Sequence, residues 1–218
     1  MFFYLLKYKK KINEFLSDKK LAEIFRGSAW SLAARIIATV AGLISSIIIS
    51  RSYGADVLGI VSILHSFLIL VTIFTLLGTK TSILRLLPEH LTKYSPSSAF
   101  KVYRKIQLFV LVISLITGSI VFFSSGFIAE TIFSKAHLKP YFAIASGFII
   151  FKSLSDLSLQ AIRGLRHIRI FALMQLLPQF SMLFILSTLT ILFYNHNNPI
   201  YSLFASFAVT AIFGVLIM

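Results

Sequence analysis

Six stretches of the chain are continuously apolar over about twenty residues, the length that a helix needs to cross a bilayer core of ~30 Å. Within lipid only helices or closed barrels satisfy the backbone, and barrel strands are alternating runs of only ~10 residues. The sequence therefore predicts an all-α, polytopic transmembrane bundle. Its six spanning helices are expected at about 29–50, 57–79, 106–126, 141–162, 170–193 and 200–218.

The composition argues against a soluble domain and excludes several kinds of chemistry. Only 13% of the residues are charged, against about a quarter in a typical soluble domain. The chain has no cysteine, so disulfides, thiolate metal sites and cysteine nucleophiles are excluded. No Gly-rich phosphate loop, HExxH sequence or metal-ligand spacing is present. We therefore expect a protein that is not an enzyme and that uses no metal and no cofactor.

Basic residues predict which side of the membrane each loop faces. Sixteen of the 21 Lys and Arg residues lie in residues 1–28 and in the loops 80–105 and 163–169, which the six spans place on one side. The opposite loops hold only Arg51, Lys135 and Lys139. Because cytoplasmic loops are enriched in Lys and Arg, both ends of the chain are expected in the cytoplasm and the bundle in the inner membrane. Since topology explains the positive charge, no nucleic-acid partner is expected.

The first 28 residues form a basic lead-in to the bundle. Apolar residues such as Ile12, Phe15 and Leu16 recur among lysines, a pattern typical of helices that lie on anionic headgroups. We expect a cytoplasmic, interfacial segment that contacts membrane lipids; the alternative is a tail that only sets the topology. The lysines follow the apolar start MFFYLL instead of preceding it, so no cleavable signal peptide is indicated.

The connection 80–105 is the only long one between spans. It contains Pro88 and Pro96. We expect a surface helix around Ser97 to Lys105.

Lys152 and Asp156 lie near the middle of the fourth apolar stretch. A charge at that depth costs at least ~2.5 kcal/mol on insertion scales. Four-residue spacing places both side chains on one helix face, which Gln160 extends by one turn. One interpretation is an internal ion pair that only lowers the insertion cost. The other is a charged site in a water-filled cavity, where Lys152 attracts an anionic headgroup and Asp156 tunes it or accepts a proton.

Other polar residues inside the spans are further candidates for a binding site. Arg35 lies about 10 Å into the first span, where it either snorkels to the interface or lines a cavity and binds phosphate oxygens. Gln175 and Gln179 flank Pro178 in the fifth span, and interrupted helices often mark transporter sites. They could bind sugar or phosphate, or serve only helix packing. His65 in the second span is more simply explained by packing.

Several segments of the chain together resemble the polysaccharide-biosynthesis flippases, which export O-antigen and exopolysaccharide within the multidrug/oligosaccharidyl-lipid/polysaccharide superfamily. The resemblance begins with GSAWSLAARIIATVAGLISSIIISRSYGADVLGIVSIL from residue 27 onwards, with an Arg in the first helix and the turn Arg51-Ser-Tyr-Gly54. The segments ILRLLPEH (83–90) and LQAIRGLRHIRIFALMQ (159–175) are similar to the family's stretches after the second helix and around the fourth connection.

The resemblance implies one six-helix lobe of a two-lobed transporter. Such proteins move a polyprenyl-diphosphate-linked oligosaccharide from the inner to the outer leaflet by alternating access, for lipopolysaccharide or other surface polysaccharides. The second lobe is not among these 218 residues. Either the sequence is a fragment of a longer flippase, or a second lobe comes from another gene or from a homodimer. Arg35 matches the family's first-helix Arg, whereas Lys152 and Asp156 are candidates on physical grounds alone.

These observations together predict a flippase for a lipid-linked oligosaccharide. Arg35 and Lys152 would bind the diphosphate, with Asp156 beside them, and three amides would bind sugar: Gln160, Gln175 and Gln179. One alternative is a truncated membrane scaffold that transports nothing. Another is a multidrug or cation antiporter of the same superfamily, although that would favour carboxylates over cations in the cavity.

Overall fold

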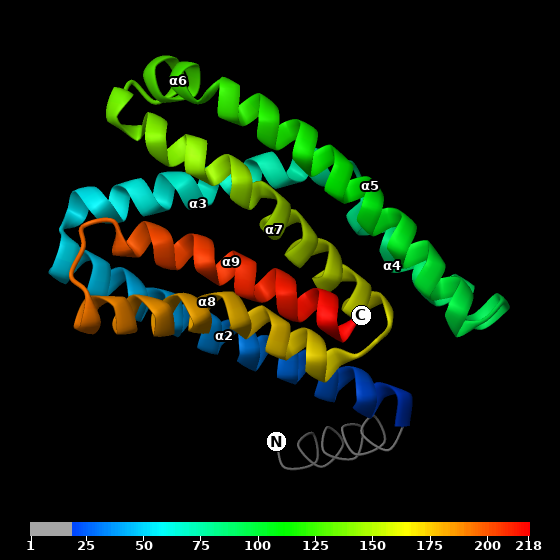
Figure 1. The fold of residues 1–218 in the computed structure, drawn as a ribbon. Coiled ribbons are helices and arrows are strands. Elements are labelled where there is room, and N and C mark those ends of the chain that lie inside the picture. Colours follow the sequence, from blue (N-terminus) through cyan, green and yellow to red (C-terminus); the bar gives the residue numbers. More distant parts are fainter. Residues whose placement is uncertain (1–18) are drawn as a thin grey trace, which may run out of the picture.

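A computed structural model describes residues 19–218, in which every regular element is helical (Figure 1). Six of the helices are long and apolar enough to cross a membrane, so the predicted all-α, six-span class is confirmed and the chain is a multi-pass membrane protein. The spanning helices are α2 (Lys19–Tyr53), α3 (Ala55–Leu76), α5 (Pro96–Phe123), α7 (Lys139–Gly164), α8 (Ile168–Leu192) and α9 (Asn198–Ile217). The predicted lead-in lies largely outside the described residues.

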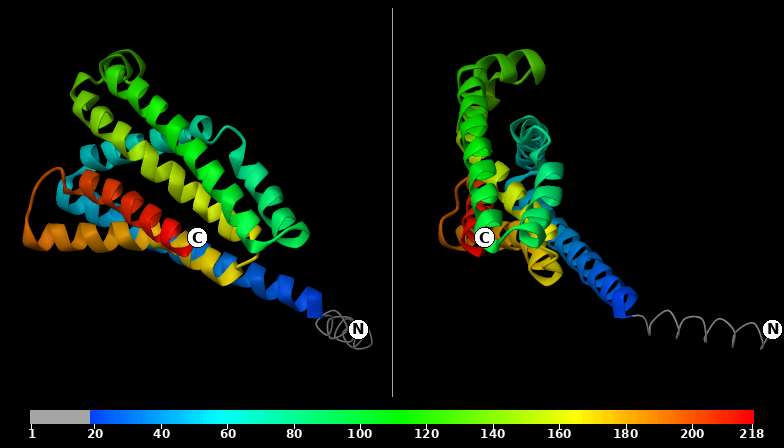
Figure 2. Two further views of the ribbon diagram at one scale, coloured as in Figure 1. Left: turned by 45° about the vertical axis from the view of Figure 1, so that its right-hand side comes forward. Right: turned by 90° about the vertical axis from the view of Figure 1, so that its right-hand side faces the viewer.

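The shorter elements connect these spans. They are α4 (Thr79–Lys93), α6 (Ser125–Phe127), the π-helical turn η1 (Ile128–Ile132) and the 3-10 turn η2 (Ala136–Leu138). The start of α2, α4, the start of α5 and the α7–α8 turn all lie toward one end of the bundle, which we call the basic end (Figures 1 and 2). The orientation of this end toward the cytoplasm remains a prediction.

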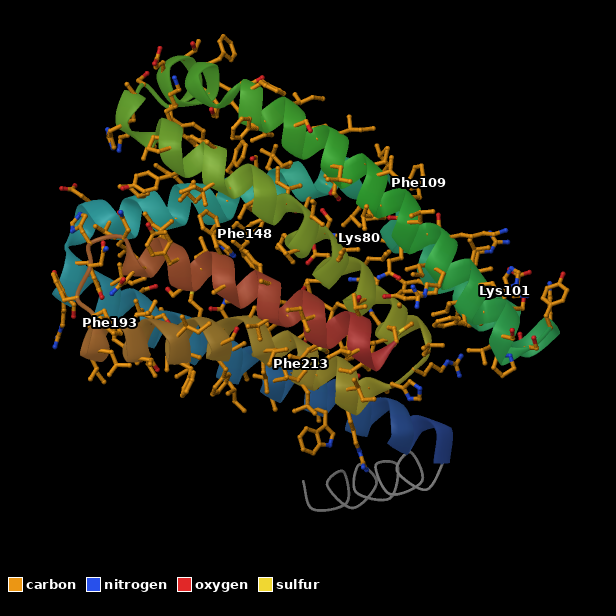
Figure 3. The ribbon with its side chains drawn as sticks, viewed as in Figure 1. Lys80, Lys101, Phe109, Phe148, Phe193 and Phe213 are labelled. Atoms are coloured by element: carbon orange, nitrogen blue, oxygen red, sulfur yellow. The ribbon has the colours of Figure 1, made fainter. Side chains whose placement is uncertain are left out.

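Helix α7 is the centre of the packing. It contacts α3, α4, α5, α8 and α9, while α2 packs mainly on α8. The largest fully buried side chains include Phe142 and Phe204. Phenylalanines such as Phe109, Phe193 and Phe213 are instead exposed on the outside of the bundle, as suits a surface that faces lipid (Figure 3).

The long connection differs from the prediction, because its helix begins much earlier than expected. Leu77 and Gly78 adopt positive φ angles of 37° and 78° and reverse the chain, and α4 starts at once. Ile83 and Leu87 of α4 are buried in a cluster with residues of α3, α5 and α7. The segment expected as a separate surface helix, Ser97 to Lys105, is instead the first part of α5. The amphipathic spacing of residues 79–93 explains why α4 forms there, because it lets one face of the helix be buried.

A polar junction, formed by Tyr53, Thr190 and Asn198, ties helices together at the end opposite the basic end. The hydroxyls of Tyr53 and Thr190 lie 2.7 Å apart. The buried Asn198 amide donates to the carbonyls of Leu189 and Phe193 at 3.2 and 2.5 Å. The junction therefore connects the α2–α3 turn, the end of α8 and the start of α9.

The contact between α5 and α7 offers a test of the packing. A Cβ added at Gly118 would lie 2.9 Å from the backbone oxygen of Ser146, whereas one added at Gly147 would meet nothing within 4 Å. Gly118→Ala should therefore destabilise the bundle by about 1–3 kcal/mol, because a backbone atom must move. Gly147→Ala is the matched control. The measurement is the Tm of each purified variant in detergent, and equal values for the two would contradict this packing.

Candidate functional site

A cavity of about 410 Å³ lies among α2, α3, α7, α8 and α9. Its apolar wall includes Ile49, Val61 and Phe207. Polar side chains from all five helices complete the lining: Thr39, Ser45, Ser46, Ser62, His65, Lys152, Gln179 and Ser206. Lys152 is the charged member of this set, so the cavity has a cationic wall within the membrane-spanning part of the protein.

Lys152 belongs to a group of three charged side chains centred on Asp156. One carboxylate oxygen of Asp156 accepts a hydrogen bond from Lys152 on the same helix. The other oxygen accepts from Lys80 Nζ at 2.9 Å. The side chains of Lys152 and Asp156 are 14% and 18% exposed, and that of Lys80 is 37% exposed. Two cations thus share one anion, which leaves the group with one net positive charge.

The ammonium group of Lys152 also contacts an aromatic wall. Its Nζ lies 5.6 Å from the centre of the Phe207 ring, within the range of a cation–π interaction. The imidazole of His65 stacks on the same ring, with centroids 6.0 Å apart and planes inclined by 8°. Phe207 therefore contacts both Lys152 and His65 at the cavity.

The neighbouring polar residues of α7 are occupied by structural contacts. Ser153 Oγ lies 2.7 Å from Thr75 Oγ1, and Ser158 Oγ lies 3.1 Å from the Tyr103 hydroxyl. These pairs fasten α7 to α3 and to α5. Lys152 is the polar residue of α7 that faces the cavity.

The other predicted site residues differ in whether they reach the cavity. Gln179 lines the cavity, with its Oε1 against Gly42, where an added Cβ would lie 3.2 Å away. Arg35 is exposed, one helical turn from the cavity-lining Thr39, whose hydroxyl donates to the Arg35 carbonyl at 2.9 Å. Gln160 and Gln175 are partly buried and are not part of the cavity lining. The structure therefore brings Lys152 and Gln179 together at the cavity, keeps Asp156 bound to Lys152 outside the cavity lining, and leaves the other three apart.

Gln175 and Pro178 show how α8 contributes. The helix runs continuously through Pro178, which lies at the cavity. Gln175 Oε1 is buried and, among the described residues, has no hydrogen-bond partner. An unsatisfied buried amide costs stability unless water or another group reaches it.

Sequence reasoning missed Lys80 as a member of the group. The sequence places Lys80 in the predicted loop 80–105, because its pattern does not predict a helix that begins at Thr79. The signal that could have found it is the sequence Leu77-Gly78-Thr79-Lys80, a helix stop followed by a helix whose buried positions, Ile83 and Leu87, are four residues apart. Figure 3 shows Lys80 beside α7.

Comparison of the chain with family models, with curated proteins and with solved structures finds no match. The function therefore has to be argued from the geometry described above.

The three-charge group makes a graded stability prediction. Asp156→Asn should destabilise the protein by about 3–5 kcal/mol, because two partly buried ammonium groups lose the counterion that they share. Lys80→Gln should cost less, because its side chain is more exposed and one cation stays paired. The exposed pair Lys93–Glu89 on α4 supplies the control, and Lys93→Gln should leave the Tm unchanged. Thermal unfolding in detergent would contradict the shared-carboxylate geometry if Asp156→Asn behaved like the control.

Proposed function

We propose that this protein is a membrane carrier that translocates a polyprenyl-diphosphate-linked oligosaccharide across the cytoplasmic membrane, with the basic end in the cytoplasm. The observation that carries the proposal is the ammonium group of Lys152, which lines a cavity within the membrane-spanning helices as part of a group with net positive charge. A carrier of this kind makes and breaks no covalent bond in its substrate.

The balance of charge is the reason to favour an anionic substrate. An ion pair that only stabilises the fold would be served by one cation and one anion. Here the carboxylate of Asp156 is shared by Lys80 and Lys152, so one positive charge remains uncompensated within the group. Charges within membrane helices are costly and commonly mark substrate pathways. A diphosphate would supply the missing negative charge, and a lysine binds phosphate as a compact point charge.

The size of the cavity limits what it can hold. A volume of about 410 Å³ is near the low end of small-ligand sites. It suits a diphosphate with an adjoining sugar, which Gln179, His65 and the serine hydroxyls could bind. A longer oligosaccharide needs more room, and a second six-helix unit would provide it.

Two other functions remain as competitors. A multidrug or cation antiporter should present net negative charge to its substrate, and the group at Asp156 has the opposite sign. A scaffold that transports nothing requires only that the charges satisfy one another. Substitutions that separate stability from charge sign therefore distinguish a scaffold from a carrier.

Loss of the Lys152 charge should abolish transport. Lys152→Ala, expressed from the native locus, is expected to insert into the membrane at normal levels and to reduce surface polysaccharide at least about tenfold, as one lost charge-assisted contact implies. Lys101→Ala on the exposed part of α5 is the control and should export normally. The measurement is surface polysaccharide per unit of membrane-inserted protein. Normal export by the stably inserted Lys152 variant would reject the site.

Reversing the sign of all three charges in the group at Asp156 distinguishes a carrier from a scaffold. Exchanging Lys152 and Asp156 alone would place a lysine at 156 opposite Lys80, so that protein should be unstable. Adding Lys80→Asp restores two ion pairs with every sign inverted. We expect the triple variant to regain a Tm near that of the native protein and still to export no polysaccharide, because the cavity wall is now anionic. Restored function in the triple variant would favour the scaffold.

A further inference from the structure

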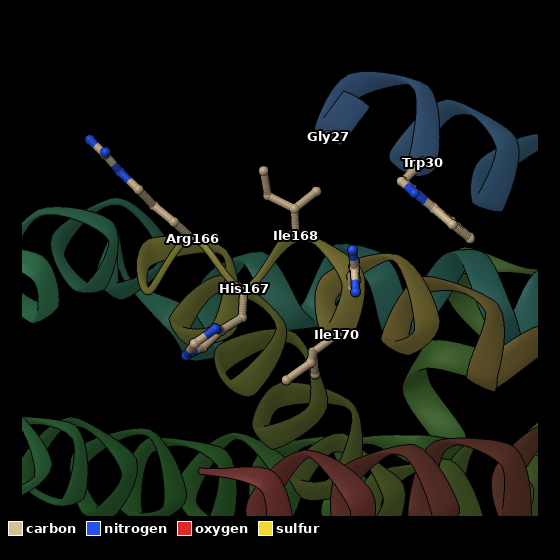
Figure 4. A pocket seen from close by; sticks show the side chains of 7 residues that line it. Gly27, Trp30, Arg166, His167, Ile168 and Ile170 are labelled. Carbon is tan, nitrogen blue, oxygen red and sulfur yellow. The ribbon is translucent and has the colours of Figure 1, made fainter. Parts of the chain in front are cut away.

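A second cavity, of about 440 Å³, lies at the basic end between the first turns of the apolar part of α2 and the α7–α8 turn (Figure 4). Its lining is Gly27, Trp30, Arg166, His167, Ile168, Arg169 and Ile170. None of these residues lines the cavity at Lys152. We propose that this pocket binds the headgroup of an anionic phospholipid, with the lipid phosphate at the arginines and the start of an acyl chain against Trp30 and Ile168.

Close packing of α2 on the start of α8 forms the base of the pocket. A Cβ added at Gly27 would lie 2.5 Å from Ile168 Cδ1, so the absence of a side chain at Gly27 lets the two elements meet. In Figure 4 the side chain of Ile168 points toward Gly27, and Trp30 extends from α2 toward the same turn. Arg166 has a positive φ of 59°, which turns the chain sharply between α7 and α8. Arg166 and Arg169 both line the pocket beside this turn, and in Figure 4 the Arg166 side chain extends outward from it.

Of the three arginines in this region, two are available for a ligand. The guanidinium of Arg163 lies 5.8 Å from the centre of the Phe171 ring and is engaged there. Arg166 and Arg169 are exposed, and neither makes an ion pair within residues 19–218 as described. Guanidinium groups bind phosphate oxygens through paired hydrogen bonds. Basic pockets at the ends of membrane helices recognise anionic lipid headgroups.

Trp30 indicates a lipid in preference to a soluble anion. Trp30 is 53% exposed near the end of a spanning helix. Tryptophan is enriched at the depth of the lipid headgroups. The pocket thus places cations, an interfacial indole and an aliphatic side chain side by side. A phospholipid has a phosphate for the cations and an acyl chain for the indole and the aliphatic side chain, whereas a free anion would use the arginines alone.

The single tryptophan of the chain makes the pocket directly observable. The protein is reconstituted in phosphatidylcholine vesicles. A brominated lipid, which quenches a tryptophan on contact, is then added. It is brominated phosphatidylglycerol in one sample and brominated phosphatidylcholine, at the same mole fraction, in the other. We expect Trp30 to show roughly a thirtyfold preference for the brominated phosphatidylglycerol, the effect of two basic residues near a lipid surface at about 1 kcal/mol each. The preference should fall to about twofold or less in Arg166→Gln/Arg169→Gln.

A second pair of basic residues tests whether the preference belongs to a site. Lys101→Gln/Lys105→Gln removes the same charge from exposed positions of α5 at the same end of the bundle. This variant should keep the preference. If it loses as much as the arginine variant does, diffuse attraction to the vesicle explains the result and the pocket is rejected. Unchanged Trp30 emission in pure phosphatidylcholine verifies that each variant is folded. If the emission of Arg166→Gln/Arg169→Gln shifts, the single variant Arg169→Gln is used in its place.

Inorganic phosphate distinguishes the lipid from a free anion. Phosphate and sodium chloride are each added to the native protein at the same ionic strength. Phosphate should weaken the lipid preference no more than chloride does, because both act only by screening. Stronger competition by phosphate would assign the pocket to a soluble anion and overturn the lipid proposal. Neither measurement involves polysaccharide export, so failure here leaves the proposal for Lys152 untouched.

Discussion

The shared carboxylate of Asp156 is the interaction on which the arrangement of the central helices depends. A carboxylate within a spanning helix is expensive unless cations satisfy both of its oxygens. Lys152 supplies one partner from the same helix, and Lys80 supplies the other from α4 at 2.9 Å. The second contact requires the chain to reverse at Gly78 and α4 to lie against α7. The ion pair thus adds to the burial of Ile83 and Leu87 in fixing α4 to the centre of the bundle.

The sequence was sufficient for the part of this arrangement that is local. Length and hydropathy predict the six spans, and four-residue spacing predicts the pairing of Lys152 with Asp156, because both follow from the geometry of one helix. Lys80 lies 76 residues from Asp156 in the chain, so its role depends on how α4 packs. The same limit applies to the glutamines. Gln175 and Gln179 share a helix face in sequence terms, yet only Gln179 reaches the cavity, because the neighbouring α2 comes close at Gly42.

The two cavities use basic residues in different ways, and burial explains the difference. At Lys152 the ammonium group is largely shielded, so the protein itself supplies a carboxylate and an aromatic ring to stabilise it. At Arg166 and Arg169 the guanidinium groups are exposed and need no protein counterion. Exposed cations at a membrane surface gain from anionic headgroups, while a shielded one gains most from a ligand that enters with its own charge. The same residue class thus fits lipid contact at the rim and substrate binding inside.

Transport through the cavity at Lys152 would require the opposite end of the bundle to open. That end is held by the polar junction of Tyr53, Thr190 and Asn198 and by buried apolar side chains beside it, among them Ile49, Leu186 and Ile200. Each hydrogen bond in such a junction contributes only about 0.5–1.5 kcal/mol net, because water offers an equivalent partner once the groups separate. An apolar seal of the same extent would expose hydrocarbon to water on opening and resist it more strongly. The hydroxyls and the Asn198 amide can exchange their bonds for those of water or sugar, so in a carrier the apolar contacts beside them would set most of the cost of opening this end.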